Sequence, residues 1–190
     1  DVHEYATRQS EHSRVWRWTE SPYMRWLVRT HLNRADAVTT VSGGLADAYR
    51  DEFGIESRVV TNAAVLRDLR PSPVSTPIRL VHSGIAAPQR RLEIMIDAMR
   101  MTRADATLDF FLIDDGSPYL SSLHERAAGD PRIRFNPPVS LETLVPTLNQ
   151  YDVGLGVLPP TTFNLAWCLP NKFFDFVQAR LLSLIHISEP

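Results

Sequence analysis

The sequence has little cysteine, almost no lysine and no long apolar run. A single cysteine, Cys168, in 190 residues excludes an internal disulfide framework. No stretch of about 18 apolar residues is present, so the sequence predicts no membrane-spanning helix. The net charge of −2 provides no general attraction for nucleic acid, and we expect no nucleic-acid partner. Residues 1–4 lack the basic and apolar regions of a signal peptide, so the expected compartment is the cytoplasm.

The two ends of the sequence are unusual. Residues 182–190 look like the translation of a sequencing adapter, and we interpret them as an artefact tail. The chain begins with Asp1 and without a leading strand, and the natural reading frame is expected to stop near Leu181, within a helical pattern. We therefore interpret the chain as an internal fragment of a longer protein and expect the fragment itself to be inactive.

The first part of the chain predicts a small α/β arrangement followed by a break. A helix is expected to begin at Ser21-Pro22, because serine caps helices and proline suits the first helical position. Strands are expected at 37–41 and 58–61, on either side of a helix from Ser42 to Gly54. Three prolines within 70–77 exclude a continuous helix or central strand. We predict a domain over 1–70, a linker over 71–77 and a second domain over 78–181.

After the prolines, apolar runs alternate with helical apolar spacing. Strands are expected at 78–82, 108–113, 133–135 and 152–158, and helices at 92–99, 119–128, 141–148 and 171–180. Strands that are apolar on both faces favour a parallel sheet covered by helices on both sides. The predicted fold class is therefore α/β, with parallel sheets flanked by helices. Ligands of such sheets bind beyond the carboxyl ends of the strands, in the loops after residues 82, 113 and 158.

The first candidate site is the strand-to-helix turn that contains Ser83-Gly84, Arg90 and Arg91. Gly84 would let the backbone approach a ligand, and the two arginines offer forked donors for phosphate near a helix N-terminus. The alternative is a turn glycine with two solvated arginines. The sequence has neither G-x-G-x-x-G nor a P-loop lysine, so the usual dinucleotide and NTPase motifs are absent.

The second candidate site is the expected helix that begins near Asn171. Lys172, the sole lysine among 20 basic residues, and Asp175 are three residues apart and share one helix face. Lys172 could hold a diphosphate, and Asp175 could accept hydrogen bonds from a ribose. The alternative is an exposed ion pair that contributes well under about 1 kcal/mol.

Two further clusters of polar side chains offer less specific signals. His3-Glu4 lacks the second histidine of a zinc-protease helix, because residue 7 is threonine, and we expect no metal site. Asp114-Asp115 follow an apolar strand, where paired carboxylates can hold Mg²⁺ or accept a phosphoryl group. A charged loop is the commoner outcome. On the basis of this pair, a receiver-like domain or another non-catalytic binding module remains an alternative.

Taken in order, six segments resemble the group 1 retaining glycosyltransferases, which have the GT-B fold. The matching segments are 1–4, 35–42, 60–63, 80–84, 144–155 and 169–176. The resemblance implies two incomplete Rossmann-like domains, the end of the acceptor-side domain over 1–70 and a truncated nucleotide-sugar-binding domain over 78–181. The sequence departs from the family at Trp167, where the acidic partner of Asp175 is usual, and at Asp175 itself, where glutamate is usual.

The resemblance also implies a function and site roles. The expected activity is transfer of a sugar from a nucleotide-sugar donor, with retained configuration and no metal or other cofactor, to a glycan or lipid-linked acceptor of the cell envelope. His3 would contact the transferred sugar, and Asp175 would bind the ribose. Gly84, Asn171, Lys172 and either Arg90 or Arg91 would lie at the donor diphosphate. We expect at most peripheral association with the inner face of a membrane. A nucleotide-sugar epimerase with the same fold remains an alternative.

Overall fold

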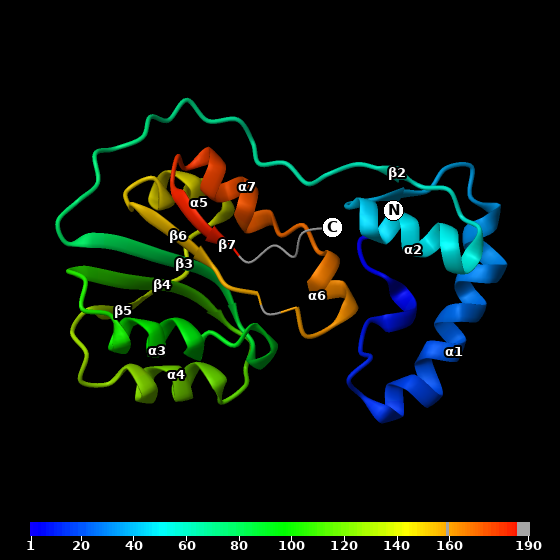
Figure 1. Ribbon diagram of the computed structural model, residues 1–190, viewed down its shortest axis with the longest axis horizontal. Coiled ribbons are helices and arrows are strands. Elements are labelled where there is room, and N and C mark those ends of the chain that lie inside the picture. The colour runs from blue at the N-terminus through cyan, green and yellow to red at the C-terminus, as the bar shows by residue number, and fades with distance from the viewer. Residues whose placement is uncertain (159, 186–190) are drawn as a thin grey trace. The chain divides into compact units, whose positions relative to one another are not determined.

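The computed structural model describes residues 1–158 and 160–185, which form two compact units (Figure 1). The first unit contains 1–63 and 160–170, and the second contains 64–158 and 171–185. The predicted division was 1–70, 71–77 and 78–181. In the structure the first of the two segments of the first unit ends at Ala63, so the proline-rich stretch belongs to the second unit. Residues 160–170 return to the first unit because their contacts lie there.

The first unit is mostly helical. Its elements are η1 (Ala6–Arg8), α1 (Arg14–His31), η2 (Leu32–Arg34), β1 (Thr39–Thr40), α2 (Gly43–Phe53), β2 (Arg58–Val59) and α6 (Phe163–Trp167). Strands β1 and β2 pair in parallel, and Val2 forms a bridge with Thr40. The core is formed by buried apolar side chains of the chain start, of α1, of α2 and of the residues on either side of β1; among them are Tyr5, Val38, Leu45 and Tyr49.

Helix α1 begins earlier than Ser21-Pro22, so that prediction is wrong. Ser13 is the N-cap, and its Oγ accepts a hydrogen bond of 3.2 Å from the backbone N–H of Trp16. Ser21 is buried instead, and its hydroxyl donates to the carbonyl of Thr7 at 2.9 Å. Pro22 lies inside the helix on an exposed position, where the cost of one missing backbone donor is tolerated.

Helix α2 matches the predicted helix from Ser42 to Gly54. Gly54 ends it in the left-handed conformation with φ of 66°, as expected for a glycine C-cap. Ser42 stands at the N-cap position, but its hydroxyl donates to the carbonyl of Trp167 at 2.8 Å rather than capping the helix.

Helix α6 was not predicted from the sequence. Asn164 fixes it by accepting from the backbone N–H of Tyr5 at 2.6 Å and donating to the carbonyl of Tyr5 at 3.3 Å. Gly44 leaves room for the Trp167 ring, because a Cβ on Gly44 would lie 2.0 Å from that ring. The residues that α6 contacts are more than 100 positions away along the sequence, so no local pattern predicts this helix.

The second unit is a five-stranded parallel sheet. Its strands are β3 (Ile78–Ala86), β4 (Ala106–Asp114), β5 (Ile133–Asn136), β6 (Val153–Gly156) and β7 (Leu182–Ile185), in the order β5-β4-β3-β6-β7. Its helices are η3 (Pro88–Arg90), α3 (Glu93–Met101), α4 (Tyr119–Ala127), α5 (Leu141–Leu148) and α7 (Asn171–Gln178). The register of the central pair runs from Ile78 opposite Ala106 to Ala86 opposite Asp114.

Helices cover both faces of this sheet (Figure 1). Helices α3 and α4 pack on one face over a core that contains Ile96, Phe110 and Leu123. Helices α5 and α7 pack on the other face, where Val81 and Phe176 are fully buried. The predicted α/β class with parallel sheets flanked by helices is confirmed. Among the described residues, no helix is both long and apolar enough to cross a membrane.

The strand order locates the ligand edge of the sheet. Counted along the chain within the unit, the strands lie in the order 3-2-1-4-5, which is the Rossmann order. A receiver-like domain has the order 2-1-3-4-5, so the topology does not favour that alternative. The order reverses between β3 and β6, and the crevice beyond their carboxyl ends is where such sheets bind ligands.

Part of the predicted artefact tail takes part in the sheet. Residues 182–185 form β7, which pairs in parallel with β6 from Val153 opposite Leu182. Pairing satisfies backbone groups of β6 that would otherwise form an open edge. The rest of the predicted tail, 186–190, lies outside the described residues.

Candidate functional site

Lys172 and Gly84 meet at the carboxyl end of β3. Gly84 has a φ of 145°, and a Cβ built on it would lie 2.5 Å from Nζ of Lys172. The ammonium group therefore lies against the bare backbone of the strand, in space that any other side chain at position 84 would fill. Lys172 belongs to the first turn of α7, so the helix start and the strand end position one cation at the topological switch point.

His82 adds a buried imidazole to this cluster, although it was not among the site residues predicted from the sequence. Its side chain is 3% exposed, and Nδ1 lies 2.7 Å from the carbonyl oxygen of Leu155. A carbonyl can only accept, so Nδ1 carries the proton and Nε2 carries the lone pair of the neutral ring. Burial first, and then the charges of Lys172 and Arg90, lower the pKa of His82 to about 3, although the hydrogen bond to Leu155 acts in the opposite direction. The available signal was its place two residues before Gly84, on the same side of the strand.

The buried neutral state of His82 predicts a pH-dependent stability. The unfolded chain binds a proton at this residue below its ordinary pKa of 6.5, whereas the folded chain does so only near 3. The stabilisation of the folded state that comes from neutral, buried His82 is therefore fully present above about pH 6.5 and is lost as the pH falls. We expect the free energy of unfolding to decrease by about 1.4 kcal/mol per pH unit from this group between pH 6 and pH 4.5. Urea unfolding at several pH values measures it.

The matched variant for this prediction is His82→Asn, which keeps a donor toward Leu155 but cannot be protonated. Its unfolding free energy should lack this component of the pH dependence. His12→Asn, a change at an exposed position, is the control. Equal pH slopes for His82→Asn and the unchanged protein would contradict the prediction.

The structure distinguishes the two neighbouring arginines. Arg90 is half-buried, and its charge acts on His82, so it lies on the side of the cluster. Arg91 is exposed, has a left-handed φ of 50°, and forms a 3.5 Å ion pair with Glu93. The spacing in the sequence left this choice open, because it depends on the conformation of the turn after β3.

Helix α7 carries the two remaining predicted site residues. Asn171 is exposed at its first position. Asp175 is half-buried one turn later, and burial raises the pKa of its carboxyl while the charge of Lys172 partly offsets this. The carboxylate is thus held in a partly dehydrated position near a cation, where a hydroxyl donor of a ligand would stabilise its charged form.

The structure brings together Gly84, Lys172, Asp175 and Arg90, with His82, within the second unit. His3 belongs to the first unit, where it is exposed next to the Val2 bridge. Its assignment as a residue that contacts the transferred sugar stays a prediction.

The Asp114-Asp115 pair forms an ordinary turn after β4. Asp114 Oδ1 accepts from the backbone N–H of Gly116, and Asp115 Oδ1 accepts from that of Ser117, both at 2.9 Å. These Asx-type bonds explain both exposed carboxylates without a ligand. Within the described part of the chain, no group of three or more His, Cys, Asp or Glu side chains could hold a metal ion.

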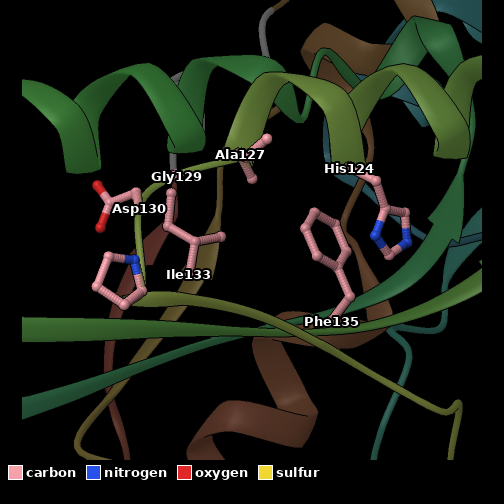
Figure 2. A pocket seen from close by; sticks show the side chains of 8 residues that line it. His124, Ala127, Gly129, Asp130, Ile133 and Phe135 are labelled. Atoms are coloured by element: carbon pink, nitrogen blue, oxygen red, sulfur yellow. The ribbon is translucent and has the colours of Figure 1, made fainter.

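A separate hollow of about 410 Å³ lies between the end of α4 and β5 (Figure 2). His124 stacks on Phe135 at one side, with ring centroids 4.0 Å apart. The one carboxylate in its lining, Asp130, is held by Arg132 at 2.7 Å. The turn over 128–131 precedes β5, so the hollow reaches the amino edge of the sheet, away from the Lys172 cluster. It offers no cluster of cations for a phosphate.

The whole described chain can be compared with known proteins. No family model matches the sequence, and no curated protein matches it significantly. Two crystal structures of TarM match 97% of the chain. One is a mutant from S. aureus in complex with fondaparinux, alpha-GlcNAc-glycerol and UDP (TM-score 0.71, 9% identity), and the other is a second structure of TarM (TM-score 0.70, 8% identity). The pneumococcal O-GlcNAc transferase GtfA, in complex with UDP and GlcNAc, matches 86% (0.61, 14%).

The chain has the glycosyltransferase fold of the GT-B type. This likeness rests on structure, because the identities are far too low to carry a substrate or a residue role across. The chain spans about a third of the length of these proteins, 35% of TarM and 32% of GtfA. The glycosyltransferase fold agrees with the Rossmann strand order and with a cationic cluster at its switch point.

Proposed function

We propose that the protein containing this chain is a retaining group 1 glycosyltransferase and that the second unit binds its nucleotide-sugar donor. The carrying observation is the Lys172 ammonium lying on the bare backbone of Gly84, at the carboxyl end of the strand where the sheet order reverses. A nucleoside diphosphate carries negative charge, and this crevice is where the fold accepts such a ligand.

The residues have distinct proposed roles. Lys172 and Arg90 bind the diphosphate, and Gly84 leaves room for both the lysine and the ligand. Asp175 accepts hydrogen bonds from the ribose, and Asn171 lies at the diphosphate end of the helix. His3, from the first unit, contacts the transferred sugar.

The chemistry follows from the charges. When the bond between the anomeric carbon and the diphosphate oxygen breaks, negative charge grows on the leaving diphosphate. Two fixed cations stabilise that charge more in the transition state than in the ground state, which is how electrostatic catalysis lowers a barrier. We propose that no metal ion is required, since the cations are supplied by the protein. The proposed acceptor is a cell-envelope glycan or glycolipid, made in the cytoplasm during polysaccharide biosynthesis.

Product analysis tests the proposed activity. The protein containing this chain is incubated with nucleotide sugars and with glycan or lipid-linked acceptors. Release of nucleoside diphosphate together with an acceptor product of the same anomeric configuration is the expected result. An isomerised donor without transfer would assign the protein to the epimerases instead.

The two arginines provide a prediction at this site. Arg90→Ala is expected to weaken nucleotide binding about tenfold, because one charge-assisted bond contributes on the order of 1.5 kcal/mol or more. Arg91→Ala is expected to change it less than about twofold, since Arg91 is exposed and paired with Glu93. Titration calorimetry with UDP and the other nucleoside diphosphates measures both. Arg103→Ala, an exposed change outside the cluster, is the control, and a larger loss for Arg91 than for Arg90 would reverse the assignment.

A further inference from the structure

The ring of His82 is held in one orientation by the strands on either side of it. Strand β3 lies between β4 and β6 (Figure 1). From β6, the carbonyl oxygen of Leu155 lies 2.7 Å from Nδ1. From β4, the ring of Phe110 packs against the imidazole in a T-shaped arrangement with centroids 5.9 Å apart. The side chain is buried, so these two neighbours determine where the second ring nitrogen, Nε2, lies.

Nε2 of His82 faces the same space as the ammonium group of Lys172. A Cβ built on Gly84 would lie 3.9 Å from Nε2 of His82 and 2.5 Å from Nζ of Lys172. The two nitrogens therefore border one small space beside the backbone of Gly84. Because Nδ1 carries the proton of the neutral ring, Nε2 presents its lone pair to this space, and a lone pair attracts an ammonium group.

A neutral imidazole suits this place better than other side chains would. Burial and the charges of Lys172 and Arg90 keep the ring neutral, with a pKa of about 3. A neutral acceptor orients an ammonium group without cancelling its charge. A carboxylate at position 82 would also orient the ammonium, but it would neutralise the charge and repel a diphosphate. An apolar side chain would leave the flexible lysine without an acceptor on this side.

We infer that His82 is a positioning residue of the donor site, whose Nε2 accepts a hydrogen bond from the Lys172 ammonium and directs its other N–H groups toward the diphosphate. An ammonium group has three N–H groups, so one bond to the imidazole leaves two for phosphate oxygens. Holding the long side chain in place before the nucleotide arrives reduces the ordering entropy that binding must overcome. The inference rests on the proposed function of Lys172, and it assigns to His82 an effect on the ligand that passes through the lysine.

Two amide substitutions at position 82 separate positioning from a purely structural role. The amide nitrogen of asparagine can replace Nδ1 and keep the bond to Leu155, whereas the amide oxygen of glutamine can replace Nε2 as the acceptor. His82→Asn should weaken nucleotide binding about fivefold, as expected for the loss of one neutral hydrogen bond, and His82→Gln should weaken it less than about twofold. The free energy of unfolding should rank the two variants in the opposite order, because only asparagine keeps the buried bond to Leu155.

A double-mutant cycle with Lys172→Ala tests whether His82 acts through the lysine. Titration calorimetry is performed on the protein containing this chain, with whichever of UDP, GDP, ADP, CDP and dTDP binds most tightly. Once Lys172 has been replaced, His82→Asn should change the affinity less than about twofold, since no ammonium group is left to position. His124→Asn, a change at an exposed position on α4 of the same unit, is the control and should bind nucleotide like the unchanged protein.

Nitrogen NMR of the imidazole provides a readout that requires no nucleotide. With isotope-labelled histidine, the spectrum should place the proton of His82 on Nδ1. The Nε2 resonance of His82 should shift when Lys172 is replaced by alanine, because the hydrogen bond to the ammonium group is lost. The resonances of His124 should stay unchanged in that variant.

Three outcomes would overturn the inference. The first is an equal loss of affinity from His82→Asn with and without Lys172. The second is a nucleotide affinity that follows the free energy of unfolding in both amide variants, which is the result of a structural role alone. The third is an Nε2 resonance that Lys172→Ala leaves unchanged. The failure of the proposed function gives a different result, because Lys172→Ala alone would then bind nucleotide like the unchanged protein, and the inference would fail with it.

Discussion

Replacing Lys172 by alanine is expected to weaken nucleotide-sugar binding roughly ten- to a hundredfold. The ammonium lies 2.5 Å from where a Cβ of Gly84 would be, at the carboxyl end of β3, so it occupies a defined position rather than a solvated one. A charge-assisted bond to phosphate contributes on the order of 1.5–3 kcal/mol, which corresponds to this range. Titration calorimetry with the donor nucleotide, or with UDP as the first trial ligand, measures the loss.

Gly84→Ala tests the same geometry from the strand side. A methyl group at position 84 would displace the end of the Lys172 side chain, and its φ of 145° disfavours any residue with a Cβ. Part of the loss of binding caused by Gly84→Ala should therefore depend on the presence of Lys172. In a double-mutant cycle, the two changes together should cost less than the sum of their separate effects. Fully additive effects of the two changes would contradict the assignment of Lys172 to the nucleotide site. A loss of nucleotide affinity below twofold for Lys172→Ala would contradict it as well.

The largest expected effect on stability is that of Asp152→Ala, which should lower the free energy of unfolding by roughly 3 kcal/mol. The Asp152 side chain is 1% exposed. Its oxygens accept from the backbone N–H of Arg79 at 2.7 Å, from that of Ser75 at 3.2 Å, and from the Arg79 guanidinium at 3.4 Å. Removing the carboxylate leaves several donors without their acceptor at the start of the central strand. Urea unfolding measures the change.

The pH dependence of this effect has a definite sign. Burial alone would raise the pKa of Asp152, but the hydrogen bonds from Arg79 and Ser75 outweigh it and hold the pKa below 3.8. The stabilisation is therefore present above about pH 4 and lost as the pH falls through the lowered pKa. The difference in the free energy of unfolding between the unchanged protein and Asp152→Ala should become smaller only in strong acid. Asp97→Ala breaks an exposed pair with Arg126 and should cost under about 1 kcal/mol. A similar cost for both variants would contradict the assigned role of Asp152.

The elements of the second unit could be predicted because their signals are local. Continuous apolar runs such as that of β4 belong to strands buried on both faces, and the i, i+3, i+4 spacing of α3 and α5 belongs to helices with one buried side. Lys172 and Gly84 could also be selected from local signals. The end of a strand and the start of a helix are recognisable in the sequence, and they predict the edge of the sheet where a ligand binds. Ser21-Pro22 was misleading because Ser13 offers an equivalent cap earlier in the chain.

What the sequence by itself determined is therefore the α/β class, the alternation of elements and the edge of the sheet where a ligand belongs. Only the tertiary structure decided which side chains meet. Helix α6 packs into the first unit through Asn164 and Trp167, and its partners are more than 100 residues away. His82 becomes a buried neutral acceptor only when Leu155 is paired beside it, and Arg90 is separated from Arg91 by the turn after β3. Each of these depends on contacts between distant segments, whose geometry no local periodicity encodes.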